Sequence, residues 1–406
     1  MKFAADLHIH SKYSRATSPN MNIKTLSEFA KLKGVFLLGT GDFTHYQWLK
    51  ELKNILKDSG NGLFEYNGVN FMLTGEISSI YSKNGKVRKI HSVIFAPSFD
   101  IADKINTALS GYGNIAYDGR PIIGIDVKLL AEVLFGISKD IFLVPGHIWT
   151  PWFSIFGSKS GFDSIEECFE EYAKDIYALE TGLSSDPGMN WQWSKLDRFS
   201  LISNSDSHSP QKIGREANVF DTEMSYKAVT DALKKKDKKK FLYTIEYFPE
   251  EGKYHYDGHR VCGIRFSPEE TKKNKNICPV CGKPVTIGVM NRVSELADRP
   301  AGFVPENSIP FKRMVPLSEI IADVVGVGEA SKAVAAEYSA IVPHFGTELE
   351  VLTEVSEDKL LKELPEGIAK AIINVRKGNI NILPGFDGEY GTIEILKEKE
   401  LQLKSS

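Results

Sequence analysis

The sequence predicts an α/β protein in three parts: a barrel-like region over residues 1–245, a small cysteine-containing region over 246–300, and a helical region over 301–406. In the first region, short apolar runs alternate with amphipathic stretches, as strands and helices do in a parallel sheet or barrel. Three of the four cysteines organise the second region, and helical spacing dominates the third. A chain of 406 residues is long enough for two or three domains.

The first region contains five apolar runs that predict buried strands and four amphipathic stretches that predict helices. The strands are expected at residues 35–38, 71–73, 91–96, 141–144 and 201–202. The helices are expected at residues 25–33, 48–57, 127–134 and 164–174, because their apolar residues recur every three or four positions. Asp163 or Ser164 offers an N-cap to the last of these. In the third region, residues 318–321 and 328–338 are the clearest helices.

The composition is that of a globular protein, with 42% apolar and 25% charged residues. No apolar run reaches the roughly 18 to 20 residues of a membrane helix, and the first residues lack the order of a signal peptide. Clustered cysteines favour metal binding in a reducing compartment over a disulfide framework. We therefore expect a cytoplasmic protein without a membrane partner.

The net charge of −3 does not by itself indicate a nucleic-acid partner. Part of the negative charge would belong to metal-binding carboxylates, which bound cations offset. Six lysines lie between residues 234 and 240, although such a run is more often a solvated helix end. The charge therefore allows DNA binding without showing it.

Eight side chains of types that bind metal ions are distributed over the first 208 residues, next to apolar runs. They are His8, His10, Asp42, Glu76, His91, His147, Asp206 and His208. A strand over residues 7–10 would point both of its imidazoles to one face, and the pair at 206 and 208 repeats this spacing. Each candidate lies where a strand is expected to end, which is where active sites gather in parallel α/β barrels. The sequence therefore predicts one metal-dependent catalytic site.

These residues resemble the signature of the PHP (polymerase and histidinol phosphatase) phosphoesterases, mainly in residues 6–11 and 204–208. Over nearly its full length the chain resembles, more narrowly, the endonuclease Q family of PHP enzymes, with residues 40–43, 145–152 and 254–262 carrying the match. The resemblance implies a distorted seven-stranded (β/α) barrel. It also implies a DNA repair endonuclease that hydrolyses the phosphodiester 5′ to uracil, hypoxanthine, xanthine or an abasic site in damaged duplex DNA, leaving a 3′-hydroxyl and a 5′-phosphate.

The resemblance further implies two or three catalytic divalent metals, zinc, manganese or magnesium, of which imidazole ligands favour the first two. By the family pattern, one ion is held by His8, His10, Glu76 and Asp206, a second by Asp42 and His208, and a third by His91 and His147 with Glu76 as a bridge. The chain departs from the pattern at Arg15, where many members carry an acid, and at Asp42, where others carry histidine. Arg15 is either a phosphate clamp or a structural residue, and His45 either a substitute ligand or a residue outside the site.

Several further side chains are candidates for work around this site. Glu180 ends an apolar run and is a candidate general base, ligand helper or substrate contact, with a buried structural carboxylate as the alternative. Aromatic and amide side chains in the loops could stack on a flipped base and read its edge. These substrate-binding candidates are Trp149, Trp152, Asn190, Trp191 and Gln192, with the backbone amides of residues 182–185 beside them. The alternative is that the indoles only cover the mouth of the barrel.

The cysteine pattern predicts one structural zinc ion. Cys278 and Cys281 are separated by two residues, Cys262 lies 15 residues before this pair, and His259 precedes Cys262 with the same two-residue gap. This is the spacing of a closed tetrahedral site with three thiolates and one imidazole. His255 and Asp257 are close enough in sequence to compete as the fourth ligand.

The third region is predicted to contact DNA. Gly326 and Gly328 resemble a helix-hairpin-helix phosphate-binding turn, or form an ordinary turn between helices. We find no clear clamp-binding peptide at the C-terminus, so a sliding clamp stays an open partner. The rival functions are a small-molecule phosphatase like histidinol phosphatase and a non-catalytic DNA-binding adaptor. An extension of roughly 160 residues exceeds what a phosphatase needs, and eight ligands in order oppose a loss of catalysis.

Overall fold

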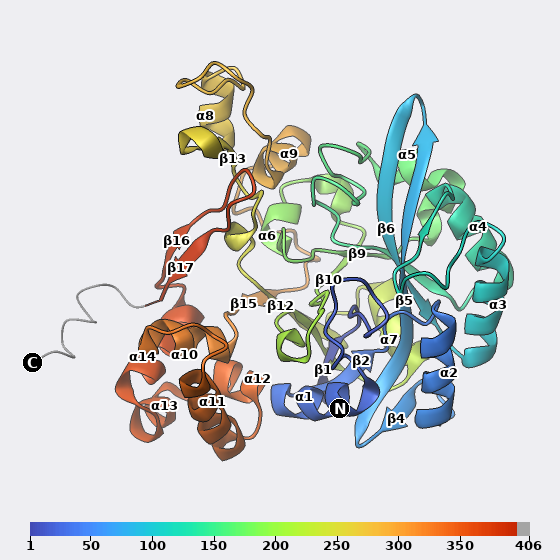
Figure 1. Ribbon diagram of the computed structural model, residues 1–406, viewed down its shortest axis with the longest axis horizontal. Coiled ribbons are helices and arrows are strands. Elements are labelled where there is room, and N and C mark those ends of the chain that lie inside the picture. The colour runs from blue at the N-terminus through green and yellow to red at the C-terminus, as the bar shows by residue number, and fades with distance from the viewer. Residues whose placement is uncertain (396–406) are drawn as a thin grey trace, which may run out of the picture.

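A mixed sheet forms the centre of the computed structural model, which describes residues 1–395 (Figure 1). Its strands follow the order β15-β12-β11-β1-β2-β5-β4-β3, and β6, β7 and β8 are attached through β5 and β6. Their bounds are Lys2–Asp6 (β1), Val35–Gly39 (β2), Lys57–Asp58 (β3), Phe64–Tyr66 (β4), Val69–Lys83 (β5), Lys86–Ala96 (β6), Ile122–Ile123 (β7), Phe142–Pro145 (β8), Ala217–Asp221 (β11), Phe241–Glu246 (β12) and Phe311–Arg313 (β15). A separate parallel pair contains Ala178–Glu180 (β9) and Ser200–Ile202 (β10).

A ring of strands in the order β1, β2, β5, β6, β8, β9 and β10 surrounds the centre of the first region. Between β8 and β9 the contact is narrow, with the Ile148 N–H donating to the Glu180 carbonyl at 3.0 Å. The ring closes between β10 and β1, where Ile9 bridges Ser207 and the His10 N–H donates to the Ser207 carbonyl at 3.0 Å. The predicted α/β fold with a distorted seven-stranded barrel is therefore confirmed.

The barrel is less parallel than its βα rhythm suggests, because β5 and β6 form a long antiparallel hairpin. Glu76 and His91 lie inside this hairpin, which corrects the expectation that every candidate ligand ends a strand. Ser78 faces His91 in the register, and Glu76 lies two residues from Ser78 on the same face. The expected strand over residues 7–10 also differs, since β1 ends at Asp6 and only a single bridge follows.

Helices cover the outside of the barrel. They are Ile23–Lys33 (α1), Tyr46–Ile55 (α2), Phe99–Leu109 (α3), Val127–Ile137 (α4), Ile165–Phe169 (α5), Pro187–Asn190 (α6) and Tyr226–Lys235 (α7). The helix expected over 164–174 is α5, capped by Ser164, followed by a 3-10 turn. The helix expected over 48–57 ends early because Lys57 enters β3. Apolar side chains of α1 to α4, including fully buried Trp48, pack against the strands as the helical spacing predicts.

The second region extends away from the barrel and receives the C-terminal hairpin of the described chain (Figure 1). Its elements are Asp257–His259 (β13), Ile264–Phe266 (β14), Pro268–Lys273 (α8) and Val289–Leu296 (α9). The hairpin of Asn381–Leu383 (β16) and Thr392–Glu394 (β17) lies beside residues 250–260. The Tyr256 N–H donates to the Gly385 carbonyl at 2.9 Å, and Asp387 accepts from the Arg260 N–H at 2.7 Å.

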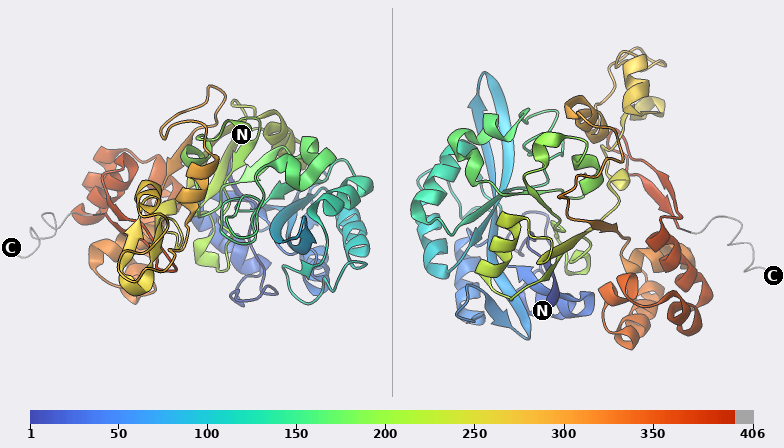
Figure 2. Two further views of the ribbon diagram at one scale, coloured as in Figure 1. Left: turned by 90° about the horizontal axis from the view of Figure 1, so that it is seen from above. Right: turned by 180° about the vertical axis from the view of Figure 1, so that it is seen from behind.

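The third region is a helical bundle at one side of the barrel (Figure 2). Its helices are Leu317–Val325 (α10), Lys332–Phe345 (α11), Glu348–Thr353 (α12), Glu357–Glu363 (α13) and Glu366–Lys377 (α14). Gly326 is the left-handed C-cap of α10, and α11 begins only at Lys332, so the glycines form an interhelical turn and not a helix N-terminus. Among the described residues, no helix is long and apolar enough to cross a membrane. Because β15 pairs with β12 and the C-terminal hairpin packs on the second region, the domain limits drawn from sequence stay a prediction.

A buried ion pair fastens the bundle to the barrel. Lys33, at the end of α1, lies 2.6 Å from Glu348 at the start of α12. The same carboxylate accepts hydrogen bonds from the Leu317 N–H at 3.0 Å and the Tyr338 hydroxyl at 2.5 Å. Both charged side chains are almost completely buried, so each depends on the other for compensation.

Removing one member of this pair should loosen the bundle. Lys33→Ala leaves the Glu348 carboxylate buried without its cation, so we expect the free energy of unfolding to fall by about 3 kcal/mol, measured by urea denaturation. Lys227→Ala is the control, because its ion pair with Asp231 is solvent-exposed and should contribute about 0.5 kcal/mol or less. Equal effects of the two substitutions would contradict the anchoring role of Lys33.

Candidate metal centre and adjoining cavity

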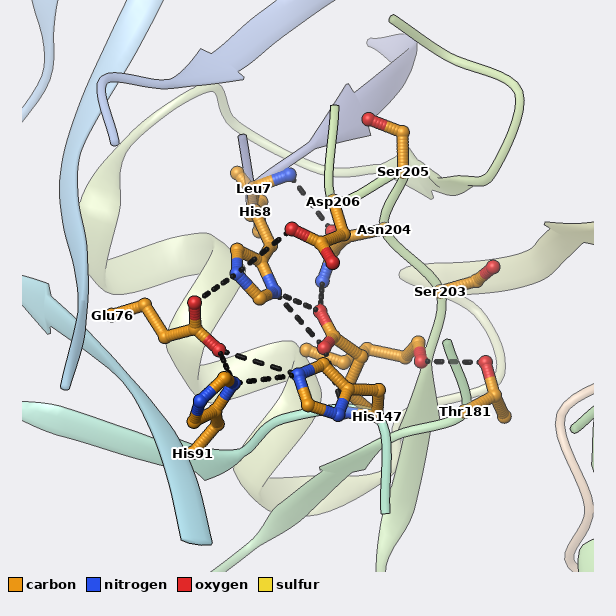
Figure 3. Close-up of polar contacts among 12 residues, drawn as sticks. Leu7, His8, Glu76, His91, His147, Thr181, Ser203, Asn204, Ser205 and Asp206 are labelled. Carbon is orange, nitrogen blue, oxygen red and sulfur yellow. Dashed lines mark hydrogen bonds and ion pairs between the residues drawn. The ribbon is translucent and has the colours of Figure 1, made fainter. Parts of the chain in front are cut away.

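Two groups of candidate ligands meet at one end of the barrel (Figure 3). In each group, the ligand atoms lie within 4.8 Å of one another. The first group contains His8, His10, Glu76 and Asp206, and the second contains Glu76, His91 and His147. The structure therefore brings together six of the eight ligand candidates, in two of the three sets that the PHP resemblance implies.

Glu76 joins the two groups because each of its oxygens faces a different one. Its Oε1 lies 2.6 Å from His91 Nδ1 and 3.3 Å from His147 Nε2. Its Oε2 lies 3.4 Å from His10 Nε2 and 3.6 Å from His8 Nε2. A carboxylate in this position can bridge two cations, which is the role implied for Glu76 by the family pattern.

The donor atoms present fit divalent metal ions. His8 Nε2 is buried and has no hydrogen-bond partner among the described residues, yet it faces Glu76 and, at 3.8 Å, Asp206 Oδ1. In the second group, His91 Nδ1 and His147 Nε2 lie 3.0 Å apart beside the same carboxylate oxygen. Mixed imidazole and carboxylate donors suit zinc and manganese better than magnesium. The identity and number of ions stay a prediction.

The buried carboxylate of Glu180 holds this ligand layer from behind. Both of its oxygens lie 3.0 Å from His8 Nδ1, the ring nitrogen that faces away from the metal group. It also accepts hydrogen bonds from the His147 N–H at 2.9 Å and the Asn204 amide at 2.8 Å. Carboxylates in this position orient metal-binding histidines and fix their tautomer. Of the roles open for Glu180, this geometry favours the ligand helper.

Asp42 occupies the equivalent position behind His10. Its Oδ1 lies 3.0 Å from His10 Nδ1, and its Oδ2 accepts from the Ser11 N–H and hydroxyl, each at 2.6 Å. A Cβ on Gly119 would lie 2.4 Å from this carboxylate, so the covering loop requires glycine there. These contacts saturate Asp42, and the structure does not bring it into either ligand group.

The other residues considered for the second ion also lie outside the two groups. His208 is at the rim, about one third exposed, with its ring 4.5 Å from the His10 ring. His45 stacks on Tyr13 at 4.3 Å between ring centroids. Asp42 contacts His10 and Ser11, and the ion implied for Asp42 and His208 stays a prediction.

Burial and charge set the protonation states of these groups. Burial alone would lower the pKa of His8, but the nearby carboxylates of Glu180 and Glu76 outweigh it and raise the pKa well above its usual value. Burial likewise would raise the pKa of Asp206, whereas the hydrogen bond from His10 brings it below its usual value. For His91, burial prevails over the attraction of Glu76 and lowers the pKa to about 4. A neutral imidazole is the form that binds metal ions.

A cavity of about 700 Å³ opens beside the ligand groups. The metal-ligand candidates His91, His147 and Asp206 are among its lining residues. Its walls come from the barrel loops and from the second region, with the lining residues Arg15, Arg120, Trp152, Tyr254 and His255 and residues 182–184 among them. The rings of Trp152 and Tyr254 meet edge to face with centroids 5.7 Å apart. This volume is sufficient for a nucleoside-sized ligand.

Arg120 is a site residue that sequence reasoning missed. Its Nη1 lies 3.4 Å from Glu76 Oε2, and its side chain lines the cavity next to Asp206. Asp118 and Gly119 make the turn that aims it inward, because the Arg120 N–H donates to the Asp118 carboxylate at 3.1 Å. The sequence Asp118-Gly119 indicates a turn, but no local pattern shows that this turn brings the Arg120 side chain to Glu76.

The substrate-binding predictions divide into two sets. Arg15 and Trp152 line the cavity, with Arg15 exposed at its rim. Trp149 and Asn190 are buried, and the indole N–H donates to the amide oxygen at 2.8 Å, which corrects the expectation that these two side chains face a base. Trp191 and Gln192 are not among the lining residues, because the loop packs this indole against Phe311. Of the expected segment 182–185, residues 182–184 line the cavity and Ser185 is buried.

A second metal-type cluster lies in the cysteine region. It contains His259, Cys262, Cys278 and Cys281, whose ligand atoms lie within 4.8 Å of one another. His259 Nδ1 is 3.5 Å from Cys281 Sγ. The competing Asp257 accepts from the Gly288 N–H and the Asn291 amide, each at 2.6 Å. His255 lines the large cavity instead, so His259 is the fourth member of the group.

Two solved structures resemble the chain over nearly its whole length. PfuEndoQ, a lesion-specific endonuclease from Pyrococcus furiosus, is 34% identical with a TM-score of 0.87, and the match covers 100% of this chain and 99% of that chain. A structure of Endonuclease Q in complex with a 27-mer duplex substrate, with an abasic lesion at the active site, is also 34% identical with a TM-score of 0.87 and covers 98% of both chains.

Sequence comparison adds a match in the helical region. Residues 316–379 match the family model described as the MJ0043 C-terminal domain. The uncharacterized protein MJ0043 of Methanocaldococcus jannaschii is 35% identical over 261 residues, which are 62% of this chain and 32% of that protein. The match therefore spans about a third of that relative's length.

The cysteine cluster leads to a test by metal content. Cys278→Ser should remove one zinc ion per chain and lower the melting temperature, since binding at a structural zinc site contributes folding free energy. Cys168→Ser is the control, because this thiol is buried in the barrel core and should leave the zinc content unchanged whatever its effect on stability. An unchanged zinc content in Cys278→Ser would rule out the cluster as a zinc site.

Proposed function

The chain belongs to the endonuclease Q family, and from that premise we propose that it is a metal-dependent endonuclease that nicks damaged duplex DNA beside the lesion. Its substrates are duplexes with uracil, hypoxanthine, xanthine or an abasic site. The cut lies on the 5′ side of the lesion and leaves a 3′-hydroxyl and a 5′-phosphate. The related Endonuclease Q complex, which carries an abasic lesion at its active site, supports duplex DNA with an abasic site as a substrate.

One observation carries the proposal: a cavity of about 700 Å³ opens directly beside the two ligand groups. An enzyme that acts next to a damaged base has to unstack it into such a space. His91, His147 and Asp206 line the cavity, and Trp152 and Tyr254 offer aromatic surfaces in its wall. The phosphodiester of a nucleotide placed there would lie next to the metal ligands.

The site residues divide the chemical work. His8, His10, Glu76 and Asp206 would hold one ion, and Glu76, His91 and His147 another. When bound, these ions supply Lewis-acid activation of water and stabilisation of the leaving oxygen. Glu180 and Asp42 keep the imidazoles of His8 and His10 in their binding orientation.

Arg120 is the residue that we assign to the phosphate. Its guanidinium lies between Glu76 and the cavity, so a non-bridging phosphate oxygen placed beside the ligand groups is within its reach. The planar guanidinium donates two parallel hydrogen bonds to a phosphate, which a lysine ammonium cannot do. Arg15, exposed at the rim, is left to attract DNA by charge.

The predicted partners beyond the site remain at the level of proposal. The helical region is proposed to contact the duplex that flanks the lesion. The groove beside Gly326 is lined by Glu251, Glu319 and Asp323, a negative surface that does not suit a phosphate. A sliding clamp stays a possible partner, because the C-terminal end, where a clamp-binding peptide would lie, falls outside the described residues.

One assay separates the proposed activity from its rivals. The protein is incubated with labelled duplexes that carry a single uracil, hypoxanthine or abasic site, with a matched undamaged duplex, and with p-nitrophenyl phosphate, each with and without EDTA. We expect chelator-sensitive nicking of the damaged strands only. Hydrolysis of the dye alone would indicate a phosphatase, binding without nicking an adaptor, and equal cleavage of the undamaged duplex a nonspecific nuclease.

Loss of a metal ligand should abolish nicking. Asp206→Asn keeps the size of the side chain but removes a negative donor from the first group, so we expect the nicking rate to fall by several orders of magnitude. Asp221→Asn is the matched control, because this carboxylate is exposed at the end of β11, where it pairs with the N-terminal amine. Wild-type nicking by Asp206→Asn would exclude this centre from the reaction.

The two arginines should respond differently to substitution. Arg120→Ala removes a charge-assisted hydrogen bond to the phosphate, and we expect kcat/KM to fall about 10- to 100-fold, with little recovery in Arg120→Lys. Arg15→Ala should change kcat/KM only a few-fold, and mainly through its salt dependence. Metal content is measured in all variants, because a loss of metal in Arg120→Ala would show that the residue acts on Glu76 and not on phosphate.

A further inference from the structure

Two polar side chains of the cavity wall have unused hydrogen-bonding capacity. The Ser184 hydroxyl and His255 Nδ1 are both buried, and neither has a hydrogen-bond partner among the described residues. Both residues line the cavity beside the metal ligands. Buried polar atoms are nearly always paired in folded proteins, so unpaired ones in a cavity wall indicate a ligand that pairs with them.

His255 is an uncharged member of the cavity wall. Burial, aided by the positive charge of Arg313, lowers its pKa to about 4 and keeps the imidazole uncharged. The backbone carbonyl of Pro249 acts on the imidazole and attracts its proton. A neutral imidazole carries a single N–H, so with that proton on Nε2 the unpaired Nδ1 keeps its lone pair.

Deamination changes a base in a way that such an acceptor detects. Cytosine and adenine present a ring nitrogen with a lone pair beside an exocyclic amine. In uracil and hypoxanthine the same ring position carries an N–H, and a carbonyl replaces the amine. A lone pair in the cavity wall therefore meets a donor in uracil or hypoxanthine. In cytosine or adenine, it meets another lone pair.

Resting on the function proposed above, we propose that His255 is the specificity-determining residue of the lesion cavity, accepting a hydrogen bond from the ring N–H that deamination creates. Ser184 donates to the adjacent carbonyl. A hydroxyl can also accept, so Ser184 discriminates less, and the selection against cytosine and adenine comes from His255. Leaving a buried polar group unpaired is what rejects the wrong base.

The fold holds both residues firmly enough for this role. The segment that carries His255 is bound to the C-terminal hairpin, where the Gly385 N–H donates to the Glu250 carbonyl at 2.8 Å and the Gly388 N–H to the Lys253 carbonyl at 2.9 Å. Gly182, two residues before Ser184, approaches His147 so closely that a Cβ would lie 2.5 Å from the histidine Cβ. This approach keeps Ser184 near the metal ligands.

The abasic site provides an internal reference, because it has no base to read. We would measure single-turnover nicking of uracil, hypoxanthine, abasic and matched cytosine duplexes by His255→Phe and His255→Gln, with Lys227→Ala as the control on the exposed face of α7. His255→Phe keeps the bulk of the ring but removes the acceptor. We expect it to lower the uracil-to-abasic and hypoxanthine-to-abasic rate ratios by about 10- to 100-fold. Lys227→Ala should leave both ratios as in the wild type.

The glutamine variant makes the test independent of the phenylalanine variant. Its amide offers both a donor and an acceptor, so His255→Gln should retain uracil nicking while narrowing the uracil-to-cytosine ratio by about tenfold or more. Unchanged ratios in both variants would overturn the proposal, as would an equal loss of uracil and abasic nicking, which indicates a structural residue. If the wild type cuts no damaged duplex, the proposed function itself fails. If His255→Phe does not fold, the uracil-to-cytosine nicking ratio of His255→Gln alone tests the proposal.

Discussion

The charge of Glu76 is the element around which the centre is arranged. Its two oxygens face ring nitrogens from both ligand groups and the guanidinium of Arg120. Burial would raise the pKa of this carboxyl, but the adjacent His91 and His8 outweigh it and lower the pKa well below its usual range. The antiparallel register of β5 and β6 fixes its position. A slip by one residue would turn Glu76 to the outer face and leave the histidines without their shared counter-charge.

Three residues at this centre have strained backbone conformations. Asp42, His147 and Asp206 all have left-handed backbone conformations, with φ values of 50°, 29° and 46°. Side chains other than glycine adopt such angles only where other contacts offset the cost. Here the contacts are to the ligand layer itself, through Ser11 for Asp42, Glu180 for His147 and His10 for Asp206. Backbone strain, burial and ligand orientation are therefore parts of one arrangement.

Residues whose partners are close in sequence could be predicted, and those that depend on distant contacts could not. The spacing of Cys278 and Cys281 already contains the geometry of their cluster, and the pair at His8 and His10 needs only extended backbone. Arg120 acquires its role from Glu76, which is 44 positions away and reached by a turn whose direction no local pattern shows. The sequence does not show that Trp149 and Asn190 are buried, because an aromatic loop has the same residue pattern whether its side chains face the core or a cavity. The sequence indicates His255 only as a competing zinc ligand, because the place of this side chain depends on a hairpin 130 residues later in the chain.

That C-terminal hairpin also determines the order in which a working enzyme can emerge from the ribosome. The seven strands of the barrel and its two ligand groups all lie within residues 1–206. The segment with Tyr254 and His255 is translated well before residues 381–394, yet it is hydrogen-bonded to them in the finished fold. A nascent chain therefore contains both metal-ligand groups before the cavity wall around His255 is complete. The bundle that precedes the hairpin sets the length of this interval during translation.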